Sequence, residues 1–138
     1  MRVMVLDNDD ETALRLTRML RTLGHDPFVA EARYYLEDLQ EHGPFHLVIT
    51  EIFLKDISGL QVVLGVKGLD ASIKVVAMSG GAPPALSDDY LDYAREFGAD
   101  AVVRKPLDVE RLDALLAGIG QADGPHRRPD ASVTSRIV

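Results

Sequence analysis

The sequence contains no cysteine and no hydrophobic run long enough to cross a membrane. Without cysteine, disulfide bonds, thiolate metal sites and cysteine nucleophiles are excluded, and the composition suits a reducing compartment. A membrane-spanning helix needs about 18 to 20 apolar residues, and no segment approaches that length. The apolar N-terminal residues give way to acidic ones at Asp7, unlike a secretory signal. We therefore expect a cytoplasmic protein that does not act at a membrane.

Positive charge is also scarce. The chain has 15 Lys and Arg against 22 Asp and Glu, a formal net charge of -7. This balance repels the phosphates of nucleic acids, and no basic patch offsets it in the part expected to fold, so we expect no nucleic-acid partner. A chain of 138 residues with 46% hydrophobic content can form one domain with a single core, and is too short for two domains of ordinary size.

Short apolar runs alternate along the chain with amphipathic segments of helical period. This alternation predicts an α/β fold, a doubly wound parallel sheet of five strands covered by helices on both faces. The expected strands are 2–6, 27–30, 46–50, 74–78 and 101–103. The expected helices are 10–23, 32–39, 59–69, a segment marked by apolar residues between 90 and 97, and 109–119.

The apolar pattern ends near Gly120, so the predicted domain is residues 1–120. Asp108 is the predicted N-cap of the last helix. Its expected buried stripe consists of Val109, Leu112, Leu115, Leu116 and Ile119. Residues 121–138 contain two prolines and no helical or strand period, which predicts a disordered or docking tail.

Polar side chains follow the expected strands at the points where those strands end. They are Asp7 and Asn8 after the first strand, Glu51 after the third, Ser79 after the fourth and Lys105 after the fifth. Each alone has a simpler explanation, as a helix cap or a solvated charge. The carboxyl ends of parallel strands share one edge of the sheet, so all five should meet in one pocket. Carboxylates that hold a divalent cation, with a hydroxyl and an ammonium for phosphoryl oxygens, suit phosphoryl transfer to a carboxylate.

Four stretches of the sequence carry a family resemblance: VMVLDNDDE, LVITEIFLKDISGLQVV, VVAMSGG and FGADAVVRKPLD. On these motifs the chain resembles, over residues 2–119, the receiver domain of bacterial two-component response regulators. The resemblance implies a flavodoxin-like (βα)5 fold with strand order 2-1-3-4-5. It also implies a magnesium site and an aspartate on the third strand that a histidine kinase phosphorylates.

The resemblance assigns a role to each pocket residue by position. Glu51 takes the place of the phosphoacceptor, Ser79 that of the phosphate-sensing hydroxyl and Lys105 that of the conserved cation. The implied metal ligands are Asp7, Asn8, Glu51 and the backbone carbonyl of Phe53.

Glu51 departs from the family pattern because the acceptor is normally aspartate. Its carboxylate reaches about 1.5 Å further, one carbon–carbon bond. A displacement of about 1 Å can cost on the order of a hundredfold where in-line geometry is needed, so we predict no useful phosphorylation at Glu51. The longer side chain could instead approach Lys105 or Ser79 and partly imitate a phosphoryl group. Such a receiver would be a phosphomimetic or would stay in its inactive shape, and the sequence leaves both open.

Asn8 departs from the pattern because it replaces the second acidic residue after the first strand. The amide removes one negative charge from a site for a hard dication, so Mg²⁺ binding should be weak. Asp9 is not expected to compensate, because its side chain should point elsewhere.

Two further departures concern the conformational change that the resemblance implies. Val102 stands where the family usually has a Tyr or Phe whose ring moves between exposed and buried positions. The short, stiff side chain of valine cannot make that movement. Tyr90 and Tyr93, expected at the start of the fourth helix, are alternative reporters. The segment from Ser79 to Tyr90 also looks a few residues longer than the family norm.

These features together favour an atypical single-domain response regulator, not an enzyme, that signals by protein contact. The expected partners are a histidine kinase, a phosphotransfer protein or another regulator, bound through the fourth helix, fifth strand and fifth helix, with a homodimer as a further option. One alternative is a haloacid dehalogenase-like phosphohydrolase that uses Asp7 and Asp9. Another is a pseudo-receiver adaptor with no response to metal or phosphate donors.

Overall fold

The computed structural model describes residues 1–80 and 84–122. Strands and helices alternate along the chain: β1 (Arg2–Leu6), α1 (Asp10–Thr22), β2 (Asp26–Val29), the 3₁₀ turn η1 (Ala32–Tyr34), α2 (Tyr35–Glu41), β3 (Leu47–Glu51), α3 (Gly59–Leu69), β4 (Lys74–Ser79), α4 (Pro84–Glu96), β5 (Ala101–Arg104) and α5 (Val109–Ala122). Within the described residues, no helix has both the length and the apolar character needed to cross a bilayer.

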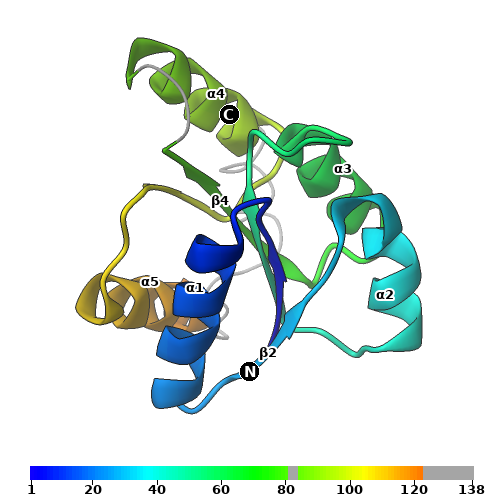
Figure 1. Ribbon diagram of the computed structural model, residues 1–138. Helices are drawn as coiled ribbons and strands as arrows, with labels where there is room; N and C mark the ends of the chain where they lie inside the picture. The colour runs from blue at the N-terminus through cyan, green and yellow to red at the C-terminus, as the bar shows by residue number, and fades with distance from the viewer. Residues whose placement is uncertain (81–83, 123–138) are drawn as a thin grey trace.

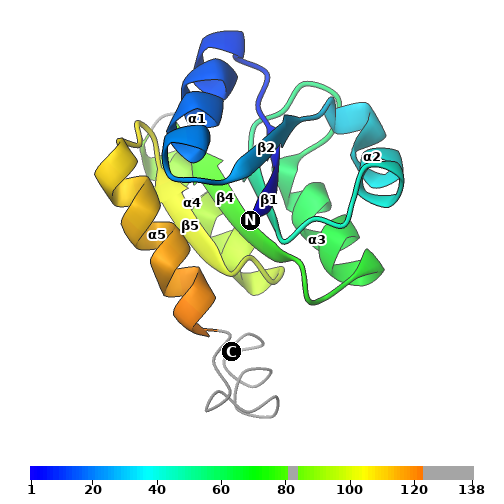
Figure 2. The same ribbon diagram turned by 90° about the horizontal axis from the view of Figure 1, so that it is seen from below.

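The strands form one parallel sheet in the order β2-β1-β3-β4-β5. Helices α1 and α5 cover one face of the sheet, and α2, α3 and α4 cover the other (Figures 1 and 2). The predicted doubly wound, flavodoxin-like fold and its strand order are confirmed.

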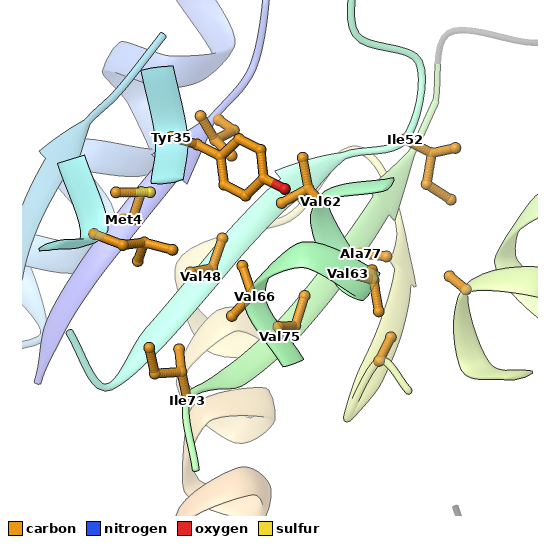
Figure 3. Close-up of a cluster of buried hydrophobic side chains, with 14 of the residues drawn as sticks. Met4, Tyr35, Val48, Ile52, Val62, Val63, Val66, Ile73, Val75 and Ala77 are labelled. Atoms are coloured by element: carbon orange, nitrogen blue, oxygen red, sulfur yellow. The ribbon is translucent and has the colours of Figure 1, made fainter. Parts of the chain in front are cut away.

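The face covered by α2, α3 and α4 holds a core in which the β-branched residues valine and isoleucine are the largest group (Figure 3). Val62, Val63 and Val66 of α3 are fully buried against strand residues such as Val48 and Val75. Burying a side chain of this size contributes about 1.5–3 kcal/mol relative to exposure. Because all three valines lie on one side of α3, their packing fixes the position of the helix on the sheet. This packing also holds the N-terminus of α3 beside the end of β3.

The other face is covered by leucine and isoleucine from α1 and α5. Leu112, Leu116 and Ile119 are buried as predicted, whereas Val109 and Leu115 are only partly buried. The Asp108 carboxylate accepts a hydrogen bond from the Arg111 N–H at 2.8 Å, which confirms the predicted N-cap.

The start of α4 differs from the expectation. The helix begins at Pro84, so Tyr90 lies at its middle and Tyr93 in its second half, and the segment between β4 and α4 is shorter than the sequence suggested. Proline is favourable in the first turn of a helix, where its missing N–H costs nothing. At the other end of the chain α5 continues to Ala122, and the rest of the predicted tail lies outside the described residues.

The segment between β3 and α3 is fixed by a capping box. The Ser58 hydroxyl accepts from the Leu60 N–H, and the Gln61 side chain accepts from the Ser58 N–H. The Gly59 N–H donates to the Ile52 carbonyl at 2.7 Å. The D-I-S-G turn therefore ties the start of α3 directly to the end of β3.

His25 lies at the amino edge of the sheet, opposite the pocket edge. Its Nδ1 is 2.8 Å from the Met1 amino group. Burial, and then the positive charge of that ammonium, lower the pKa of His25 below its ordinary value of 6.5.

The free energy of unfolding is expected to fall as the pH drops below about 6.5, in part because of His25. A lowered folded-state pKa means that the unfolded chain binds a proton at a higher pH than the folded chain does. The contribution of His25 to the free energy of unfolding is therefore fully present above the pKa that His25 has in the unfolded chain. It declines as the pH falls through that value. Urea titrations between pH 8 and pH 5 should show a shallower decline for His25→Gln. An unchanged decline would contradict the assignment.

Candidate functional site

The register of the sheet brings four strand ends to one edge. Leu6 pairs with Thr50, Glu51 with Met78, and Ser79 with Arg104. The residues at or just after these ends, including Asp7 and Lys105, therefore converge, as parallel strands require.

Lys105 joins the two acidic residues of this edge. Its Nζ lies 2.6 Å from Asp7 Oδ2 and 2.8 Å from Glu51 Oε1. The side chains of Asp7 and Glu51 are 2% and 6% exposed, and that of Lys105 is 18% exposed. Two nearly buried carboxylates thus share one ammonium.

The bridge keeps Lys105 charged. Burial by itself would lower the pKa of Lys105, but hydrogen bonds to Asp7 and Glu51 and the charges of both carboxylates together raise that pKa above its ordinary value of 10.5. Lys105 is therefore an ammonium at neutral pH.

The second oxygen of Glu51 is occupied by backbone donors. Oε2 accepts hydrogen bonds from the N–H groups of Ile52, at 2.7 Å, and Phe53, at 3.4 Å. The longer side chain folds back on its own backbone while its other oxygen reaches Lys105. Both carboxylate oxygens have partners, so an incoming phosphoryl group would have to displace them.

Gly80 makes room for the stem of Lys105. A Cβ at Gly80 would lie 2.7 Å from Lys105 Cβ and 3.2 Å from Lys105 Cδ. A side chain at position 80 would push the lysine stem aside, so glycine here determines where the ammonium lies.

Asn8 links the segment after β1 to the segment after β3. Its Nδ2 donates to the Phe53 carbonyl at 3.0 Å, and its Oδ1 accepts from the Lys55 N–H at 3.2 Å. The two partners fix the orientation of the amide, because a carbonyl only accepts and an N–H only donates. The sequence analysis treated Asn8 as a lost carboxylate and a weak metal ligand. The ability of an amide to donate and accept at once was the available signal for this second role.

Asp9 turns away from the pocket. Its carboxylate accepts from the Thr12 hydroxyl at 2.6 Å, and this hydrogen bond lowers the pKa of Asp9 below its ordinary value of 3.8. Its own N–H donates to Asp7 Oδ1 at 2.9 Å. Asp9 therefore does not compensate for Asn8 by direct contact in this arrangement. It is also poorly placed to serve as the acid beside Asp7 in a dehalogenase-like pair.

Ser79 ends β4 with its side chain buried at 1% exposure. Its carbonyl accepts from the Lys105 N–H at 2.9 Å, so the end of β4 is joined to the pocket lysine. The structure thus brings Asp7, Glu51, Ser79 and Lys105 to the same edge.

An aromatic contact leads from the pocket to α4. The Phe53 ring packs edge-on against Tyr90 with ring centres 5.0 Å apart, and Tyr90 packs against Tyr93 at 5.7 Å. Val102 is half-buried and packs beside the α4 face of the core. Phe53, whose backbone contacts Asn8 and Glu51, therefore connects the pocket to α4 through its ring.

The four groups that the resemblance implies as metal ligands are each engaged by another part of the chain. Asp7 and Glu51 contact Lys105, Asn8 contacts Phe53 and Lys55, and the Phe53 carbonyl accepts from Asn8. Among residues 1–80 and 84–122, no group of three or more acidic or histidine side chains is arranged to hold a metal ion. In this arrangement the residues fit a divalent cation poorly, because Lys105 already pairs with both carboxylates and Asn8 presents an N–H to the Phe53 carbonyl.

Comparison with known proteins gives a consistent result. The family profile of the response regulator receiver domain matches residues 3–117. NtrX from Brucella abortus superposes with a TM-score of 0.78 at 22% identity, over 88% of this chain and 27% of that one. A two-component response regulator from Clostridium difficile gives 0.77 at 20% identity, over 88% and 96% of the chains. The chemotaxis protein CheY4 from Vibrio cholerae gives 0.75 at 17% identity, over 86% and 97%. These identities show the fold alone, and no curated protein matches the sequence.

Proposed function

The chain belongs to the response regulator receiver domain family, and from that premise we propose that its signalling state is set by its own pocket side chains and not by phosphorylation. The observation that carries the proposal is the Glu51 carboxylate, which is held by Lys105 on one oxygen and by backbone N–H groups on the other. The function would be that of a cytoplasmic receiver in two-component signalling.

Two properties of Glu51 support the absence of phosphorylation. The extra methylene displaces the carboxylate by about 1.5 Å from the place of an aspartate, which is enough to spoil in-line attack. The ion pair and hydrogen bonds also hold the carboxylate in a bent conformation at 6% exposure. A phosphodonor would have to open these contacts before it could react.

The contact between Glu51 and Lys105 supports partial imitation of the phosphorylated state. An ammonium that contacts the acceptor side chain is one of the interactions that a phosphoryl group would make. The imitation is limited because a carboxylate carries one negative charge, whereas a phosphoryl group carries about 1.5 to 2. A fixed state of this kind would act by presenting one surface to its partners.

The surface that we propose for partners includes α4, β5 and α5. Tyr93 and Phe97, near the end of α4, are 46% and 39% exposed, and large exposed apolar side chains favour protein contact. The aromatic contacts of Phe53 with Tyr90 and of Tyr90 with Tyr93 would connect this surface to the pocket. The partner would be a histidine kinase, a phosphotransfer protein or another regulator, with a second copy of the chain as the alternative. Any binding of Mg²⁺ would be weak.

The proposal is tested by intact-mass measurement after incubation with Mg²⁺ and a small-molecule phosphodonor. The parent chain should gain no phosphoryl group, whereas Glu51→Asp combined with Asn8→Asp should gain one. The rate for the parent should be lower by on the order of a hundredfold or more, because the displaced carboxylate loses in-line geometry.

Glu11→Asp is the matched control, because it shortens an exposed acidic side chain by the same methylene outside the pocket. Like the parent, it should gain no phosphoryl group. Phosphorylation of the parent at Glu51 would overturn the proposal. If the double variant also gained nothing, the pseudo-receiver adaptor would become the better description.

A further inference from the structure

The contacts of Asn8 resemble those of a bridging cation. The amide Nδ2–H lies against the Phe53 carbonyl, and this one side chain joins the segment after β1 to the segment after β3. A divalent cation held between these segments would bind the same carbonyl oxygen and would join the same two segments. The amide supplies a partial positive charge at that place without any ion.

An aspartate at position 8 could not make both contacts. Its carboxylate could still accept from the Lys55 N–H, but its other oxygen would face the Phe53 carbonyl oxygen at about the 3.0 Å of the present hydrogen bond. Two acceptors at that distance repel each other unless a cation or a proton lies between them. An aspartate at position 8 would therefore need a cation beside it, whereas Asn8 does not.

Lys105 supplies the positive charge that the Asp7 and Glu51 carboxylates need. Its ammonium contacts Asp7 and Glu51 together, which leaves the three side chains with a single net negative charge. An acid at position 8 would add a second negative charge within the same pocket. That charge would lie beside two nearly buried carboxylates that already share one ammonium, and like charges in one pocket repel each other.

We propose that Asn8, with Lys105, replaces the divalent cation of this pocket, so that the receiver holds its two pocket segments together without metal. The inference rests on the proposed function because both concern the same pocket. The two fail separately: Mg²⁺ binding by the parent chain as tight as that of Asn8→Asp would overturn this inference and leave the chemistry of Glu51 untouched, whereas phosphorylation of Glu51 would overturn the proposed function.

The experiment is a thermal unfolding series with and without Mg²⁺ at constant ionic strength, in the absence of any phosphodonor. The parent Tm should not respond to Mg²⁺ beyond a KCl control. Asn8→Asp should gain a saturable rise in Tm of several degrees, with Mg²⁺ affinity higher than that of the parent by about tenfold to a hundredfold. Asn8 is exposed, so cations from solution can reach the position and the titration reports affinity and not access.

Two matched variants separate the effect of Asn8 from the effect of charge. Gln40→Glu makes the same amide-to-acid change on the exposed surface of α2 and should give no response to Mg²⁺. Asn8→Ala removes the bridge without adding charge, so its Tm should fall and Mg²⁺ should not restore it.

A saturable Mg²⁺ response in the parent equal to that of Asn8→Asp would overturn the inference, and so would a folded Asn8→Asp variant without any response. If Asn8→Asp did not fold, Mn²⁺ titration of the parent by NMR would decide. Selective broadening of the Phe53 and Lys55 amide signals would then refute the inference, and unaffected signals would support it.

Discussion

Replacing Lys105 with methionine is expected to lower the free energy of unfolding by about 3 kcal/mol or more at pH 7, because breaking a buried ion pair leaves uncompensated charge. The variant would leave Asp7 and Glu51 with side-chain exposures of 2% and 6% and no cation between them. Methionine keeps most of the volume of the lysine stem, so the loss would come from charge and not from a cavity. Urea unfolding at pH 7 measures this difference.

The pH dependence of Lys105→Met distinguishes charge repulsion from a general packing defect. Without the ammonium, burial and mutual repulsion should raise the folded-state pKa of the paired carboxylates. A raised folded-state pKa makes the folded chain bind protons before the unfolded chain does. The deficit relative to the parent should therefore shrink as the pH falls from 7 toward 5.

Lys55→Met is the matched control for this prediction. Lys55 is exposed near the same pocket and contributes its backbone N–H, not its ammonium, to the hydrogen bond with Asn8. Its replacement should change stability by less than about 0.5 kcal/mol. Equal stability of Lys105→Met and the parent would show that the bridge is not needed to neutralise the pocket.

Gly59→Ala is expected to lower the free energy of unfolding by about 3 kcal/mol, at the upper end of the cost of overpacking. An added Cβ would collide with the carbonyl oxygen of Glu51 and the Cα of Ile52. Both are backbone atoms, so no flexible side chain can move aside. The end of β3 or the start of α3 would have to shift, and the Glu51 carboxylate would shift with it.

Gly68→Ala gives the opposite expectation in the same helix. A Cβ at Gly68 meets nothing within 4 Å, so this change should stabilise α3 by about 0.5–1 kcal/mol. Urea unfolding of both variants compares one type of substitution at two positions of α3. If Gly59→Ala were also neutral or stabilising, the contact between α3 and the end of β3 would be looser than the structure shows.

The sheet was predictable because its strands are short, buried and rich in Val, Ile and Leu. Their order along the chain is enough to place Asp7, Glu51, Ser79 and Lys105 at one edge of the sheet. Burial of α3 on the sheet was equally predictable from the sequence, since the helix is apolar nearly all round. Long-range placement followed here from local patterns, because a parallel sheet leaves few alternative arrangements.

Details that depend on atomic contacts were not predictable. The start of α4 was placed too late, because proline in the first turn suits a helix as well as a loop. The hydrogen bonds of Asn8 to Phe53 and Lys55 were missed, since they depend on the exact approach of two segments 45 residues apart. The need for Gly80 was hidden for the same reason, because only the path of the Lys105 stem reveals it.

The bridge from Lys105 to Asp7 and Glu51 also bears on how long a signalling state lasts. A phosphoryl group on a carboxylate is lost by hydrolysis, so the phosphorylated state of a receiver has a limited lifetime. Side chains of one polypeptide that pair on folding are not lost in this way, and their arrangement lasts as long as the folded molecule does. Under the proposed function, the strength of the signal would depend on the number of copies of the protein in the cell. Synthesis and proteolysis would then set the signal level that a kinase and a phosphatase set for a phosphorylated receiver.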